Sequence, residues 1–156
     1  MKKKIYNILR SIFISPEMLF AVVLFALNYY VPKIFKSIGQ WYITDANWII
    51  AVGINSGLLA FSLTQAKEIL FPTNNTLGLL KKWPDYVLLK DTTLVGIIYC
   101  GLCAICSFFV FIFKKELSEY LGLLFLINLA ISITASASLV LAHWNVKIIV
   151  GQSEES

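Results

Sequence analysis

Residues 93–113, TLVGIIYCGLCAICSFFVFIF, contain no Asp, Glu, Lys or Arg. A transmembrane helix needs about 20 predominantly apolar residues, so this segment is long enough to cross a bilayer. The composition of the chain agrees, because 58% of the residues are hydrophobic and only 14% are charged, against roughly 25% charged in soluble domains. A soluble fold of this size cannot bury so much apolar surface, so we expect a membrane protein.

Three other segments have a comparable length and apolar character, and the four predicted spans lie at about 17–35, 47–69, 93–113 and 121–142. The helical pattern of the last segment continues to about Val150, beyond what one crossing requires. The sequence therefore predicts an all-α fold, an integral membrane four-helix bundle that forms one domain over residues 16–150. A loop at 70–92 joins the second and third spans.

The two ends of the chain differ from the spans. Residues 1–15 place apolar side chains at helical spacing among three lysines and an arginine, which predicts a short amphipathic helix in the membrane interface. The residues Ser15, Pro16 and Glu17 are typical of a helix start, with a capping hydroxyl, an early proline and an early carboxylate. Residues 151–156, GQSEES, predict a disordered acidic tail.

The distribution of basic residues predicts the orientation, since cytoplasmic loops carry an excess of Lys and Arg. With the N-terminus inside, the outer side receives only Lys33, Lys36, Lys114 and Lys115 of the 13 basic residues. The inner side receives the rest: Lys2, Lys3, Lys4, Arg10, Lys67, Lys81, Lys82, Lys90 and Lys147. We therefore expect a multi-pass protein of the plasma membrane with both termini and the 70–92 loop in the cytoplasm.

Small residues mark the helix faces expected to pack closely, because lipid gives no hydrophobic drive for helix association. The second span carries a GxxxG pattern at Gly53 and Gly57. The fourth span has small residues on two faces, among them Ala130, Ser132, Thr134 and Ser136. That span is expected to be central in the bundle or to lie between protomers, and packing within one monomer and contact in a homo-oligomer both stay open.

Four polar residues fall at one predicted depth. At about 1.5 Å per residue, Asn28, Asn55, Ser107 and Asn128 lie roughly 9–12 Å below the outer ends of their spans. Buried amides in hydrocarbon need partners, so we expect these residues to form a polar layer in the outer leaflet. Two interpretations stay open: interhelical hydrogen bonds that fix the helix register, or a constriction that conducts water or ions.

The remaining reactive side chains do not form a catalytic or metal site. Cys100, Cys103 and Cys106 are three apart on one predicted helix and fan around it, so they cannot jointly hold a metal. The first two share a small-residue arc suited to helix contact. His143 has no carboxylate neighbour in the sequence that would build a triad. We expect no catalytic residue, no metal, no cofactor and no enzymatic activity.

Charge placement narrows the possible partners. No continuous basic face is available for a nucleic acid, and no charged residue lies in the core of a span, which argues against ion-coupled transport. The 70–92 loop mixes apolar and charged residues, and its candidate docking residues are Lys81, Lys82, Trp83, Asp85 and Lys90. The loop is expected either to lie on the lipid interface or to bind a cytosolic partner protein.

The order of features resembles the RexB family of small four-span phage-exclusion membrane proteins. The resemblance rests on the second span, IIAVGINSGLLAFSL, and on the Ser/Ala run with a following His, SITASASLVLAHW. It implies an ion-permeable membrane effector that depolarises the cell when a cytosolic sensor signals infection. The leading hypothesis is therefore a non-enzymatic bacterial inner-membrane protein that oligomerises and acts as a membrane effector in phage defence. The alternative is a membrane anchor that docks a cytosolic partner without conducting ions.

Overall fold

A computed structural model describes residues 15–43, 47–72, 78, 80–81, 83–113 and 120–154. This part of the chain has no strand, and its helices are α2 (Pro16–Tyr30), α3 (Pro32–Ile43), α4 (Asn47–Leu70), α6 (Tyr86–Ile112) and α7 (Leu121–Glu154). The predicted all-α class is therefore confirmed. The predicted interfacial helix at 1–15 lies outside the described residues, apart from Ser15.

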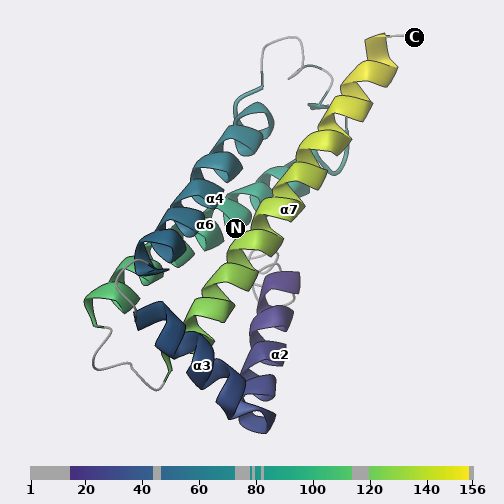
Figure 1. The fold of residues 1–156 in the computed structure, drawn as a ribbon. Helices are drawn as coiled ribbons and strands as arrows, with labels where there is room; N and C mark the ends of the chain where they lie inside the picture. The colour runs from purple at the N-terminus through teal and green to yellow at the C-terminus, as the bar shows by residue number, and fades with distance from the viewer. Residues whose placement is uncertain are drawn as a thin grey trace, which may run out of the picture.

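Three long helices form the body of the molecule, as Figure 1 shows. α4, α6 and α7 pack against one another, and α7 also contacts α2 and α3. In Figure 1, α2 and α6 run in one direction while α4 and α7 run in the other, and α3 crosses one end of the bundle. Since α7 packs against each of the other four helices, the predicted central position of the fourth span is confirmed.

The first predicted span is not one continuous helix, and this corrects the prediction of an unbroken 17–35 segment. α2 ends where the Val31 amide donates to the Leu27 carbonyl (2.8 Å), and α3 leaves at an angle of 107° to α2. Pro32 explains the break, because proline has no amide proton and disfavours helical geometry in the residue before it. Val31 accordingly has φ −134° and ψ 60°.

Two described helices are long and apolar enough to cross a membrane, α6 and the Leu121–Ile148 part of α7, and a third if the bent pair α2 and α3 is one span. This property indicates association with a membrane. α4 is 24 residues long and packs beside both helices.

The outer surface of the helices is strongly apolar. Phe25 on α2, Ile98 on α6 and Leu141 on α7 are exposed by 67%, 55% and 65%. Soluble monomers rarely expose contiguous apolar patches larger than a few hundred square ångströms. In lipid the same surface costs little, so the exterior fits a hydrocarbon environment.

Apolar side chains close both ends of the helix packing. Near α3, one cluster joins Tyr42, Val110 and Leu121. At the opposite end, where α4 ends and α6 begins, a second cluster consists of Ile69, Leu80, Tyr86 and Val146. On α6 and α7, the residues that make the polar contacts between helices lie between these two clusters in the sequence.

The crossing of α3 over α7 depends on two glycines. A Cβ atom at Gly122 would come within 1.8 Å of the Phe35 carbonyl oxygen and 2.8 Å of the Gly39 amide nitrogen. A Cβ atom at Gly39 would lie 3.0 Å from the Gly122 nitrogen. The two backbones therefore touch, which is possible only because neither residue has a side chain.

Two helices extend beyond their predicted bounds. α6 begins at Tyr86 rather than near residue 93, so the last seven residues of the predicted 70–92 loop are helical. α7 continues to Glu154, so four residues of the tail predicted to be disordered are helical. Extending an existing helix costs far less than nucleating one, and this tail contains no proline to stop it.

Candidate functional site

The first buried polar contact joins α4 to α6. The Asn55 side-chain amide nitrogen donates to the Ser107 hydroxyl oxygen at 2.7 Å, and the two residues are only 1% and 3% exposed. The Ser107 hydroxyl in turn donates to the Cys103 carbonyl of its own helix at 2.9 Å. This chain of hydrogen bonds satisfies polar groups that would be costly to leave unpaired in a membrane.

A second buried contact joins three helices, and we call its members Ser62, Cys100, Ser132 and Ser136 the Ser62 junction. The Ser62 hydroxyl lies 2.9 Å from the Ser136 hydroxyl and 3.4 Å from the Cys100 sulfur. The Cys100 thiol also donates a hydrogen bond to the Ser132 carbonyl oxygen, with a sulfur–oxygen distance of 3.9 Å. Ser62, Cys100 and Ser132 are completely buried, so α4, α6 and α7 meet here without intervening side chains.

The chemistry of the Ser62 junction suits packing. The hydroxyls of Ser62 and Ser136 and the Cys100 thiol are small and close enough to hydrogen-bond to one another. Interhelical hydrogen bonds of this kind contribute about 0.6 kcal/mol on average and up to about 1.7 kcal/mol in membrane proteins. The arrangement therefore fixes the relative positions of three helices.

The cysteines have the predicted packing role. Cys100 and Cys103 are buried, whereas Cys106 is exposed, and all three are free thiols. Thr93, Gly96 and Ser107 lie on the same buried face of α6 as the first two cysteines. The predicted contact face of α6 is confirmed.

The structure brings together two of the four residues predicted to form a polar layer. Asn55 and Ser107 are bonded, as described above. Asn28 on α2 and Asn128 on α7 are half-buried, and neither forms a hydrogen bond with Asn55 or Ser107 in the described part of the chain. The equal depth of the four residues thus did not produce one continuous layer within a protomer.

The small residues predicted for packing divide into buried and outward-facing positions. On α7, Ser132 and Ser136 are buried, and Ala130 and Thr134 are half-buried. The Thr134 hydroxyl donates to the Ala130 carbonyl at 2.8 Å, within its own helix. On α4, Gly53 and Gly57 are exposed, and a Cβ atom at either would meet no heavy atom of the described chain within 4 Å.

The predicted docking loop folds onto the end of the bundle. Leu80 is fully buried, Trp83 packs against the same apolar cluster, and the Tyr86 hydroxyl donates to the Ile69 carbonyl at 3.1 Å. The charged side chains point the other way, because Lys81, Asp85 and Lys90 are exposed. Lys82 lies outside the described residues.

Sequence reasoning did not single out Ser62. The signal was available, because Ser62 follows Asn55 by two helical turns and therefore lies on the same face of α4. A serine on the same face as a buried asparagine is a candidate for a second interhelical hydrogen bond.

Neither a protein-family model, a curated protein nor a solved structure matches this chain.

Proposed function

We propose that this protein is a non-enzymatic membrane effector of the bacterial inner membrane that works as a homo-oligomer. In this proposal it makes the membrane permeable to ions, as a pore or a depolarising component of a phage-defence system. The apolar exterior of the helices supports the membrane location. The antiviral role rests on the resemblance of the second and fourth segments to the RexB family.

The proposal includes four crossings, formed by the α2–α3 segment, α4, α6 and α7. α4 is 24 residues long, about 36 Å, which is enough to cross a hydrocarbon core of roughly 30 Å. The excess of basic residues on the side of the 70–92 loop supports cytoplasmic termini.

The observation that carries the oligomeric proposal is the outward position of Gly53 and Gly57. Small residues allow helix backbones to approach closely, but none of the described helices of the same protomer packs against this face. The Asn55–Ser107 pair is buried and joins α4 to α6 by a hydrogen bond, so we propose no path through it within a protomer. We therefore place the permeation path between protomers, whose contact is made by the Gly53 and Gly57 face of α4.

The Gly53→Ile/Gly57→Ile variant tests this contact. We expect the protomer to fold normally, because both Cβ positions are open, and we expect the oligomer to dissociate. Mass photometry in detergent gives the oligomeric state, and ion leakage from proteoliposomes gives the activity; both should fall together. Gly101→Ile is the matched control, since its Cβ is equally open but lies on α6. Leakage that persists from a monomeric variant would contradict the proposal.

The alternative function, an anchor for a cytosolic protein, is favoured by the exposed charges of Lys81, Asp85 and Lys90 above a packed Trp83. If the protein is an anchor, reversing the three charges should release a soluble protein that co-purifies with the wild type. Proteoliposome leakage should be the same for the variant and for the wild type. If the anchor function is correct, the wild-type protein itself should cause no leakage. A leaking wild-type protein that co-purifies with no soluble protein decides against the anchor.

A further inference from the structure

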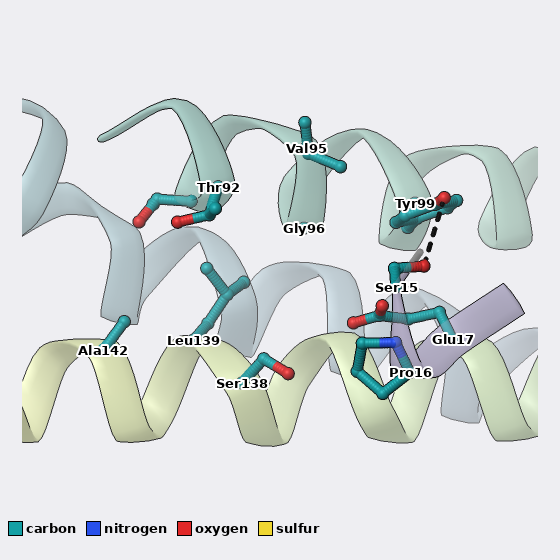
Figure 2. Close-up of a pocket in the computed structure, with 11 residues that line it drawn as sticks. Ser15, Pro16, Glu17, Thr92, Val95, Gly96, Tyr99, Ser138, Leu139 and Ala142 are labelled. Atoms are coloured by element: carbon teal, nitrogen blue, oxygen red, sulfur yellow. Dashed lines mark hydrogen bonds between the residues drawn. The ribbon is translucent and has the colours of Figure 1, made fainter. Parts of the chain in front are cut away.

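A cavity of about 270 Å³ lies where the N-terminal end of α2 meets α6 and α7, as Figure 2 shows. α2 contributes its first residues, α6 contributes Thr92 to Tyr99, and α7 contributes Ser138, Leu139 and Ala142. The cavity is slightly smaller than the roughly 300–1,000 Å³ of sites for drug-sized ligands, so its size suits a small ligand.

The length of α2 explains the cavity. Its 15 residues extend only about 22 Å, whereas the 27 residues of α6 extend about 40 Å. α2 begins beside Tyr99, and Thr92 lies two turns before Tyr99, toward the N-terminal end of α6. Small residues on α7, Ser138 and Ala142, leave part of the space unfilled, whereas Leu139 packs against Gly96 of α6.

Glu17 is the unusual member of this cavity. It is only 5% exposed, and it forms no hydrogen bond or ion pair with any residue that the structure describes. In Figure 2 its side chain extends from α2 into the space between α6 and α7. Burying a carboxylate without a partner is expensive, so such a group usually serves a ligand or a proton.

Ser15 caps the start of α2. Its hydroxyl accepts from the Met18 amide (3.3 Å) and its carbonyl accepts from the Leu19 amide (3.2 Å). The Glu17 carboxylate makes neither of these capping contacts and lines the cavity.

Two threonine hydroxyls that line the cavity use their protons within α6. Thr93 donates its proton to the Leu89 carbonyl at 2.7 Å, and Thr92 donates to the carbonyls of Leu88 and Leu89. Their oxygen lone pairs remain able to accept hydrogen bonds. Val95 and Leu139 supply apolar walls beside these oxygens.

We propose that this cavity binds a primary ammonium group on a small organic molecule. An ammonium carries one positive charge and three donors and no acceptor, which matches a cavity lined by one carboxylate and by two threonine hydroxyls that can accept hydrogen bonds. The apolar walls fit the carbon chain that carries the ammonium. A bare Ca²⁺ ion would instead need about six to eight oxygen ligands, whereas Glu17 is the sole carboxylate among the residues that line the cavity.

The position of the cavity allows two sources for the ammonium. Thr92 directly follows Lys90 and Asp91, which are charged and hence belong at the level of the lipid headgroups. The ammonium can therefore come from a phosphatidylethanolamine headgroup or from a soluble amine. This site is independent of the proposed permeation activity, so either can fail without the other.

Calorimetric titration with ethanolammonium chloride tests the site, using the full chain in nanodiscs of phosphatidylglycerol alone. We expect saturable binding, weakened about tenfold or more in Glu17→Gln, because hydrogen bonds to charged groups are among the strongest polar contacts. Asp85→Asn is the matched control, since Asp85 is an exposed carboxylate outside the cavity, and it should bind like the wild type. Tetramethylammonium, which has charge but no donor, should bind more weakly than ethanolammonium.

A second variant and a change of lipid complete the test. Ser138→Leu fills the cavity from an exposed position and should abolish binding while helicity is kept. Nanodiscs that contain phosphatidylethanolamine identify the source: competition with ethanolammonium supports the headgroup, and undiminished binding supports a soluble amine. The proposal is overturned if the wild type does not bind ethanolammonium, if Glu17→Gln binds equally well, or if K⁺ displaces ethanolammonium at equal concentration.

Discussion

Gly122→Ala should detach α3 from α7. The new methyl group would lie 1.8 Å from the Phe35 carbonyl oxygen, a backbone atom that cannot rotate away. Overpacking of a well-packed site typically costs about 1–3 kcal/mol, and a clash with backbone belongs at or above the upper end. Trp41 reports the change, because its ring lies 6.1 Å from that of Phe125 on α7. With the other tryptophans replaced by phenylalanine, its emission should shift in the variant before any denaturant is added.

Gly101→Ala is the matched control for this experiment. A Cβ atom at Gly101 meets no heavy atom of the described chain within 4 Å, so its Trp41 emission and SDS unfolding midpoint should stay at the wild-type values. Equal behaviour of the two variants would show that α3 does not rest on α7 through Gly122.

Ser62→Leu should separate the three long helices. Ser62 is completely buried, 2.9 Å from the Ser136 hydroxyl and 3.4 Å from the Cys100 sulfur, so three further carbon atoms have no space. We expect a loss of about 1–3 kcal/mol or more from overpacking. In a Cys106→Ala background, maleimide should then label Cys100 and Cys103 much faster than in the parent protein, because both thiols are buried until the bundle opens.

Two further variants serve as controls for Ser62→Leu. Ala137→Leu adds the same side chain at an exposed position of α7 and should leave the labelling rate unchanged. Ser62→Ala removes the hydroxyl without adding volume and should cost only about 0.6–1.7 kcal/mol. If Ser62→Leu labels no faster than Ala137→Leu, the Ser62 junction is not where the helices are held.

The helices could be predicted from the sequence because the apolar segments are long and carry charged residues only near their ends. The contact face of α6 was also predictable, since Cys100, Cys103 and Ser107 share an arc of small and weakly polar side chains. Pro32 lies within the predicted 17–35 span. Its effect on chain direction was missed because proline is tolerated in membrane helices, where it can kink a span without ending it.

The direction in which each helix faces was harder to predict. Gly53 and Gly57 lie on one side of α4, but that side faces away from the protomer. Lipid and protein interior are both apolar, so periodicity identifies residues that share a face without showing which face is buried. The predicted depth in the membrane is similarly incomplete. It puts Asn28 and Asn128 at the same level as Asn55, but it does not show how each helix is rotated about its axis.

Because α2 is short, the apolar length of the protein differs from one side of the bundle to the other. The apolar lengths of α6 and α7 are about 40 Å, whereas α2 spans about 22 Å before the chain turns at Val31. In the proposed arrangement, lipids beside α2 must compress their acyl chains, while those beside α6 and α7 are stretched or meet a tilted helix. Each ångström of this mismatch costs a fraction of a kilocalorie per mole, so the elastic energy of the surrounding bilayer becomes part of the stability of the protein. Membrane thickness and tension therefore act directly on the α2 side of the molecule.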